Sequence, residues 1–191
     1  MTVHRASRHI AIAATALAAL SLVSCQAVQA QLGPKLIPHD AEPELASDAC
    51  HVGDPQDCIA KCHAGQAKAC NSLAMMYEFG LKTQTDYRQA SVYYQTSCAA
   101  DFAQGCTNLG WMYAVGRGVE RNSATAMVLF TKAFEGYRTA CLNGEIQGCL
   151  LAVSHLQQGL VDARYEREEL ALLHHACELG HASSCAPVAG D

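Results

Sequence analysis

The sequence has no excess of basic residues, which argues against a nucleic-acid partner. Its 191 residues contain 13 Lys and Arg against 18 Asp and Glu, a formal net charge of −5. Arg5 and Arg8 lie in a leader predicted below, so residues 25–191 hold 11 basic and 18 acidic residues. Proteins that bind nucleic acids usually carry a basic patch that neutralises phosphates. We therefore expect no nucleic-acid partner.

A long apolar run is missing as well. The N-terminal run Ile10–Val23 has 14 residues, whereas a membrane-spanning helix needs about 20. Two arginines precede this run and small residues follow it, an order that is typical of a secretory leader. We therefore predict that residues 1–24 are a leader and that residues 25–49, which contain three prolines, are a flexible tether.

Residues Leu22-Val23-Ser24-Cys25 resemble a bacterial lipobox, whose cysteine receives a lipid and becomes the new N-terminus. The resemblance implies lipidation of Cys25, and Gln26 after it implies the outer membrane as the destination. Ordinary cleavage after Val28-Gln29-Ala30 is the alternative. The prediction is an exported, periplasmic protein that contacts a membrane only through a lipid on Cys25.

Motifs of the common hydrolases are also absent from the sequence. No serine has a lysine three positions later, and neither Gly-x-Ser-x-Gly nor His-Glu-x-x-His occurs. The nucleophile, base and zinc ligands that these motifs supply are therefore missing in their usual spacing. We predict no catalytic residue.

Cysteine, in contrast, is abundant, with 11 residues in the chain. Such a density is typical of compartments in which thiols oxidise. Equivalent cysteines recur at 36, 43 and 36 residues from Cys62 onward, and periods of this length indicate a solenoid of repeats. Apart from Cys25, the cysteines form five pairs with seven residues between the members: Cys50/Cys58, Cys62/Cys70, Cys98/Cys106, Cys141/Cys149 and Cys177/Cys185.

The spacing within each pair constrains the backbone. In one continuous helix, the Cα atoms of such a pair would be roughly 12 Å apart, whereas a disulfide tolerates only about 7 Å. If the pairs are bonded, the chain must therefore turn between them, and each disulfide joins the end of one helix to the start of the next. In the third pair Asp101 stands at the turn. In the other four pairs a glycine stands there and suits a left-handed helix end: Gly53, Gly65, Gly144 and Gly180.

The segments between the pairs carry two helical patterns. Apolar residues at positions 3, 4, 6 and 7 after Cys70, Cys106 and Cys149 form one face of a helix, which a glycine ends ten positions after the cysteine. A second helix then runs to the next pair. Seven extra residues before Cys141 amount to nearly two turns and are predicted to lengthen this second helix. The expected N-caps of the second helices are Asp86, Asn122 and Asp162, and the last one is expected to bury Leu170, Leu172 and Leu173.

These cysteine pairs, with Asn-Leu-Gly-Trp-Met-Tyr-Ala-Val-Gly-Arg-Gly-Val at 108–119, resemble Sel-one-like repeats of the tetratricopeptide-like class, and in particular the cysteine-rich Hcp-type branch. The resemblance covers roughly residues 50–191. It implies an all-α fold, a right-handed α/α superhelix of disulfide-stapled helical hairpins with a concave face. It implies function only weakly, because some cysteine-rich members are described as penicillin-binding or β-lactamase-like whereas most are adaptors.

Other uses of the cysteines and histidines fit the sequence less well. The segment from Cys58 to His63 is one residue longer than a c-type haem attachment motif. The cysteine spacings are also unlike those of zinc sites. His174 and His175 could bind a metal, but a solvated or packed helix face is the simpler interpretation. We predict no cofactor and no metal site.

Removing the core positions from the first helix of each hairpin leaves a face that would line the concave groove. Trp111 is the only tryptophan, and tryptophan is enriched at binding hot spots, although packing between repeats is an alternative role for it. His155 at a core position is predicted to be a satisfied, semi-buried histidine and not a general base. The predicted partner-binding residues are Asn71, Met75, Glu78, Asn108, Trp111, Ser154 and Gln157.

The sequence thus predicts an all-α solenoid over residues 50–191 that binds a protein or peptide in its groove and is a monomer. A β-lactamase-like or penicillin-binding hydrolase is the alternative, and only the family resemblance supports it.

Overall fold

The chain reverses direction at its cysteine pairs, and helices fill the segments between them. The computed structural model describes residue 50 and residues 54–185, and all regular secondary structure within them is helical. The predicted leader, Cys25, the tether and Gly53 lie outside these residues. The elements are α2 (Pro55–His63), α3 (Ala67–Phe79), α4 (Tyr87–Ala99), α5 (Ala103–Val115), α6 (Ser123–Leu142), α7 (Ile146–Gln157), the 3-10 helix η1 (Ala163–Glu168), α8 (Glu169–Glu178) and the 3-10 helix η2 (Ala182–Cys185).

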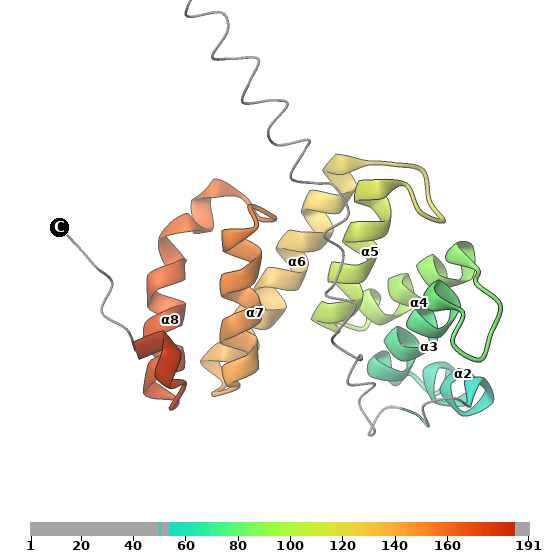
Figure 1. Cartoon of the computed structure of the whole chain (residues 1–191), viewed down its shortest axis with the longest axis horizontal. Helices are drawn as coiled ribbons and strands as arrows, with labels where there is room; N and C mark the ends of the chain where they lie inside the picture. Colours follow the sequence, from blue (N-terminus) through green and yellow to red (C-terminus); the bar gives the residue numbers. More distant parts are fainter. Residues whose placement is uncertain (1–49, 51–53, 186–191) are drawn as a thin grey trace, which may run out of the picture. The chain divides into compact units, whose positions relative to one another are not determined.

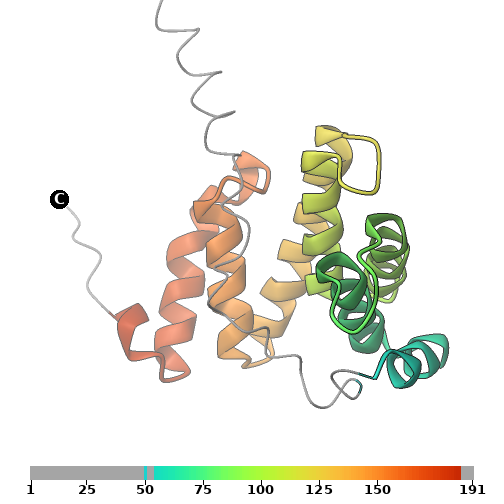
Figure 2. The ribbon, with the colours of Figure 1, turned by 45° about the vertical axis from the view of Figure 1, so that its right-hand side comes forward.

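The helices pack as antiparallel hairpins in chain order. Figure 1 shows the pairs α3–α4, α5–α6 and α7–α8, and Figure 2 shows the same order after a turn of 45°. Consecutive hairpins contact each other through α4 against α5 and α6 against α7. An all-α solenoid of helical hairpins is therefore confirmed. No helix in the described part of the chain combines the length and the apolar character that a membrane span requires.

Side-chain caps start the helices at the predicted positions. The side-chain oxygens of Asp86 and Asn122 accept hydrogen bonds from backbone N–H groups at the starts of α4 and α6. Asp54, followed by Pro55, caps α2 in the same way. Asp162 also accepts a backbone N–H, but it caps the 3-10 helix η1 and not an α-helix.

One core prediction is wrong. Leu172 is buried and Leu173 is partly buried, whereas Leu170 is 53% exposed. All three leucines lie in α8, where each residue advances the helix by about 100°. Leu170 therefore lies about 200° around the helix from Leu172 and faces solvent.

The five disulfides join the cysteines in the predicted pairs. Their Cα–Cα distances are between 4.5 and 5.0 Å, so the chain does turn within each pair. Three of the disulfides join α2 to α3, α4 to α5 and α6 to α7, and a fourth joins α8 to η2. Because Cys58 and Cys62 are bonded to Cys50 and Cys70, neither of them is free to attach a haem.

The turns adopt the left-handed conformation that the glycines predict. Gly65, Gly144 and Gly180 have φ of 86°, 93° and 101°, and Asp101 has φ of 58° at the equivalent position. The Asp101 carboxylate lies 2.8 Å from Lys132 Nζ, and the same ammonium donates to the Cys98 carbonyl at 2.9 Å. Lys132 of α6 therefore bonds to the turn at both ends. This contact gives a side chain at position 101 a role that glycine cannot fill.

We expect reduction of the disulfides to lower the thermal midpoint of unfolding strongly. On the chain-entropy estimate, a loop of about nine residues contributes about 2.5 kcal/mol per disulfide. Solenoid repeats contact only their neighbours, so little other packing replaces this contribution. Circular dichroism melts with and without reductant would measure the change, and an unchanged midpoint would contradict the expectation.

The disulfide Cys177–Cys185 should be reduced first. Cys185 is exposed and Cys177 is half-buried, whereas Cys141 and Cys149 are both fully buried. Reduction requires that a thiolate reaches a sulfur atom of the bond. Limited reduction of the native protein, alkylation and peptide mass spectrometry would therefore find label on Cys177 and Cys185 before any on Cys141 and Cys149. Labelling in the opposite order would be evidence against this hierarchy.

Candidate protein-binding face

The predicted partner-binding residues lie on α3, α5 and α7, the first helices of the three hairpins. Met75, Trp111 and Ser154 occupy the fifth position after Cys70, Cys106 and Cys149, and all three are half-buried. This row is therefore neither core nor open surface. We use the term inner face for seven residues: Asn71, Met75, Glu78, Asn108, Trp111, Ser154 and Gln157.

Trp111 is held in place by the second helix of its own hairpin. Its ring packs edge-on against Phe130 of α6, with the ring centroids 5.1 Å apart. Gly110 allows this approach, because a Cβ at that position would lie 2.7 Å from the Phe130 ring. Trp111 also borders a cluster formed by Ala126, Phe130 and Leu160. It therefore packs between helices with one part and remains accessible with the other.

Glu78 already has partners within the protein. Its Oε2 accepts from the Tyr94 hydroxyl at 2.7 Å, and its Oε1 lies 3.3 Å from Arg117 NH1. The Arg117 guanidinium in turn lies over the Tyr87 ring, 5.1 Å from its centroid. Burial, and then the negative charge of Glu78, raise the pKa of Tyr94 well above its ordinary value. The Glu78 carboxylate thus joins α3 to the middle of α4 and to the loop after α5.

Asn71 differs from the sequence prediction, which placed it on an open face. It is only 6% exposed, because its Oδ1 accepts from Asn108 Nδ2 at 3.0 Å across the α3–α5 contact. Asn108 Oδ1 accepts in turn from Gln104 Nε2 at 3.2 Å. Asn108 is half-buried, so the outer edge of this amide row is formed by Asn108 and not by Asn71.

The amide row continues into the contact between α5, α6 and α7. The Tyr137 hydroxyl donates to Gln104 Oε1 at 3.0 Å and lies 3.2 Å from Thr107 Oγ1. Thr107 Oγ1 lies 3.1 Å from His155 Nε2. All three helices therefore share one buried polar cluster at the joint between the second and third hairpins.

His155 is satisfied at both ring nitrogens, as the sequence predicted. Besides the Thr107 contact, its Nδ1 lies 2.9 Å from the Leu151 carbonyl oxygen. It is fully buried instead of semi-buried, and its ring makes edge contacts with Tyr137 and Phe130. Burial lowers the pKa of His155, and the backbone hydrogen bond opposes this shift. A histidine closed off from solvent in this way is a structural group and not an accessible general base.

The remaining two residues of the inner face, both on α7, also have partners within the protein. Ser154 Oγ accepts from Gln158 Nε2 at 2.6 Å. Gln157 is exposed and donates to Glu169 at 2.8 Å. Both keep exposed atoms that a partner could reach.

The sequence pattern missed Gln104 and Tyr137. Gln104 lies before Cys106, whereas the apolar pattern that predicts the first helix of each hairpin begins after the cysteine. Tyr137 lies in the part of α6 that is longer than the other second helices, so it has no equivalent in the neighbouring repeats. No repeat-based signal could have found Tyr137.

Within residue 50 and residues 54–185, His, Cys, Asp and Glu side chains nowhere gather in a group of three that could bind a metal ion. His174 and His175 both contact the carboxylate of Glu178, at 3.4 and 3.2 Å.

We expect the free energy of unfolding to fall below pH 6.5 because of His155. Burial lowers the folded pKa below the ordinary value of 6.5, so below that pH the unfolded chain binds more protons than the folded chain. The loss approaches at most about 1.4 kcal/mol per pH unit for one group. Urea titrations at several pH values should show a shallower pH dependence in His155→Gln than in the wild type. Equal slopes in wild type and His155→Gln would contradict the assignment.

Comparisons with known proteins identify the repeats. A family model of the Sel1 repeat matches residues 67–102 and 103–136, and no curated protein matches the chain. Similar solved structures include cysteine rich protein B of Helicobacter pylori, with 30% identity, a TM-score of 0.42 and coverage of 43% of this chain and 62% of that chain. A Sel1 repeat protein from Oxalobacter formigenes has 21% identity and a TM-score of 0.46 over 68% of this chain and 53% of that chain. A protective antigen of uropathogenic Escherichia coli with an SLR fold has 20% identity and a TM-score of 0.40 over 68% of this chain and 34% of that chain.

This chain spans less than two thirds of the length of each of these structures. The two matched segments coincide with the hairpins α3–α4 and α5–α6, the second match ending within α6. This chain therefore contains two Sel1 repeats, at residues 67–102 and 103–136.

Proposed function

We propose that the chain is a protein-interaction scaffold that binds a protein or an extended peptide on its inner face. Sel1-repeat proteins typically serve as such scaffolds, and repeat arrays present long surfaces built from equivalent positions. The observation that carries the proposal is the half-buried Trp111, which is fixed by Phe130 and yet partly accessible. A rigid aromatic residue loses little side-chain freedom on binding.

The neighbours of Trp111 support an amphipathic partner. Met75, at the equivalent position of α3, offers an adaptable apolar thioether. Asn108 is held by Asn71 and Gln104 and has one further N–H and one further lone pair. The inner face thus offers apolar contacts beside a fixed amide. A peptide with an apolar side chain and a free backbone group would match both.

The proposed location is outside the cytoplasm. Five disulfides within the described residues fit an oxidising compartment. We propose the periplasm, with residues 1–24 as leader, residues 25–49 as tether and a lipid on Cys25 that anchors a monomer to the outer membrane. Mass spectrometry of the mature N-terminus in cell-envelope material would show a lipid on Cys25, and a mature protein beginning after Ala30 would refute this anchor.

Substitution of Trp111 should weaken partner binding. Partners captured from envelope extract with the wild-type protein would be identified, purified and titrated by calorimetry against Trp111→Ala. As an anchor, Trp111 should contribute at least about 2 kcal/mol, or roughly a 30-fold change in Kd. Val128→Ala is the matched control, because Val128 is an apolar residue that is 69% exposed and lies outside the inner face.

A second variant separates binding from folding. Trp111→Leu keeps an apolar side chain against Phe130, so circular dichroism should show an intact fold while the Kd still rises. Equal affinity of wild type, Trp111→Ala and Trp111→Leu would refute the inner face as the binding site. Turnover of the β-lactam nitrocefin by the wild-type protein would instead favour the hydrolase alternative.

A further inference from the structure

The hydrogen bonds described above form one continuous chain between α3 and α7. It links Asn71 to Asn108 at 3.0 Å, Asn108 to Gln104 at 3.2 Å and Gln104 to Tyr137 at 3.0 Å. It then runs from Tyr137 to Thr107 at 3.2 Å and from Thr107 to His155 at 3.1 Å. One end is a titratable imidazole, and the other end reaches the inner face. The chain can therefore connect a protonation event to that face.

The donor-to-acceptor direction of this hydrogen-bond chain depends on the number of protons on His155. In the structure, the Tyr137 hydroxyl donates to Gln104, and each amide nitrogen donates to the next amide oxygen toward Asn71. Thr107 can complete this order only by donating to Tyr137 and accepting from His155 Nε2–H. His155 Nδ1 must also carry a proton, because it faces the Leu151 carbonyl, which can only accept. The arrangement is complete with a doubly protonated, positively charged imidazole.

A neutral His155 requires the opposite order. Its single proton stays on Nδ1, where it is donated to Leu151, so Nε2 becomes an acceptor for the Thr107 hydroxyl. Thr107 has one hydrogen and must then accept from Tyr137. Tyr137 in turn can no longer donate to Gln104, whose amide must present its nitrogen to the Tyr137 hydroxyl.

This reversal propagates through all three amides. If Gln104 exchanges the places of its nitrogen and oxygen by a half-turn, its oxygen faces Asn108 Oδ1 until Asn108 exchanges as well. When Asn108 has exchanged, its oxygen faces Asn71 Oδ1, so Asn71 must exchange its nitrogen and oxygen too. This exchange costs Asn71 little, because the contact that it loses is a weak one with the Met75 sulfur at 3.6 Å. The three amides therefore exchange together or not at all.

We propose that protonation of His155 reverses this hydrogen-bond chain and thereby turns the Asn108 amide on the inner face from one orientation to the other. No heavy atom of the backbone needs to move. The proton binds at Nε2 of His155, and every other hydrogen stays on its own residue and changes only its acceptor. The reversal itself does not depend on the proposed function, whereas its effect on a partner does.

The surroundings of His155 leave protonation as the controlling event. From α6, the titratable group in contact is the Tyr137 hydroxyl, and burial raises the pKa of Tyr137 to about 12, so it stays neutral. From α5, the contacting group is the uncharged Thr107, and α7 itself carries no Asp, Glu, Lys or Arg. On the side of α8, Glu169 bonds to Gln157. Among the described residues, no carboxylate is paired with the imidazole.

Thr107 has one competing acceptor. The Ala103 carbonyl lies 3.3 Å from Thr107 Oγ1, slightly farther than Tyr137 and His155, and it also accepts the α-helical backbone hydrogen bond of α5. If the Thr107 hydrogen went to Ala103 when His155 is charged, Tyr137 would keep donating to Thr107 and the amides would not exchange. An experiment must therefore observe the amides as well as the imidazole.

Side-chain NMR of the oxidised, full-length mature protein tests the proposal. We expect the NH2 resonances of Asn71, Asn108 and Gln104 to shift with the same pH midpoint as the His155 ring protons. The exposed Gln147 amide is the internal control and should not follow this midpoint. Amides that stay constant while His155 titrates would overturn the proposal, as would a His155 that does not titrate before the protein unfolds.

Two nearly isosteric variants cut the chain at different links. In Thr107→Val, His155 should still titrate and the three amides should no longer follow it. Tyr137→Phe should uncouple the amides in the same way, and it provides the test if the first variant is poorly folded. Amides that follow His155 in either folded variant would overturn the proposal. Because no partner is present, a negative result here is distinct from a failure of Trp111 variants to lose binding.

Discussion

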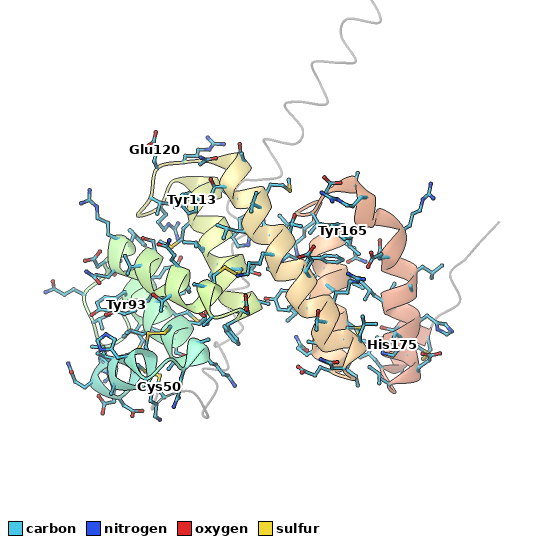
Figure 3. All side chains as sticks on the ribbon, turned by 180° about the vertical axis from the view of Figure 1, so that it is seen from behind. Cys50, Tyr93, Tyr113, Glu120, Tyr165 and His175 are labelled. Atoms are coloured by element: carbon cyan, nitrogen blue, oxygen red, sulfur yellow. A yellow bond between two sulfur atoms is a disulfide. The ribbon has the colours of Figure 1, made fainter. Side chains whose placement is uncertain are left out.

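The structure depends on one geometric constraint, the bond between cysteines eight positions apart. No single helix can satisfy that bond, so the chain must end one helix and begin the next within seven residues. This fixes where each hairpin ends, whatever the propensities of the residues around it. It also places the buried sulfurs of Cys62–Cys70, Cys98–Cys106 and Cys141–Cys149 between consecutive helices, where a larger apolar core would otherwise be needed. Figure 3 draws disulfides as yellow bonds among the side chains.

The length of α6 adds a second constraint. Its 20 residues extend it beside both α5 and α7. Phe134 and Tyr137 of α6 join one cluster with Cys149, Val153 and Leu172. Phe134 also packs against Tyr165, which is labelled in Figure 3. The Tyr165 hydroxyl donates to Glu135 of α6. The joint between the second and third hairpins therefore holds both the largest apolar cluster and the buried polar chain.

The sequence was sufficient to predict the hairpins because their signals are local. A cysteine spacing, a capping side chain such as Asp86 and a left-handed turn at Gly144 each act within a few residues, and each lies where it was predicted. The inner face was predicted less well, because exposure depends on contacts between repeats. Asn71 is buried by Asn108 of the next repeat, and Glu78 is bonded by Arg117 from 39 positions away. The prediction for Leu170 failed for a local reason, since Leu170 lies about 200° around α8 from Leu172 and cannot share its buried face.

These long-range contacts also limit how the inner face can recognise a partner. Most of its polar atoms are already paired within the protein, so a partner that replaced those bonds would gain little net free energy. Selective binding must then come from groups with unused capacity, among them the accessible part of Trp111, Met75 and the outer edge of Asn108. Asn108 offers a donor on one side and an acceptor on the other, and a partner with a fixed backbone direction matches only one orientation of that amide. Whatever sets this orientation therefore sets which direction of a partner's backbone the inner face accepts. The titratable end of the described hydrogen-bond chain is His155, buried one repeat away.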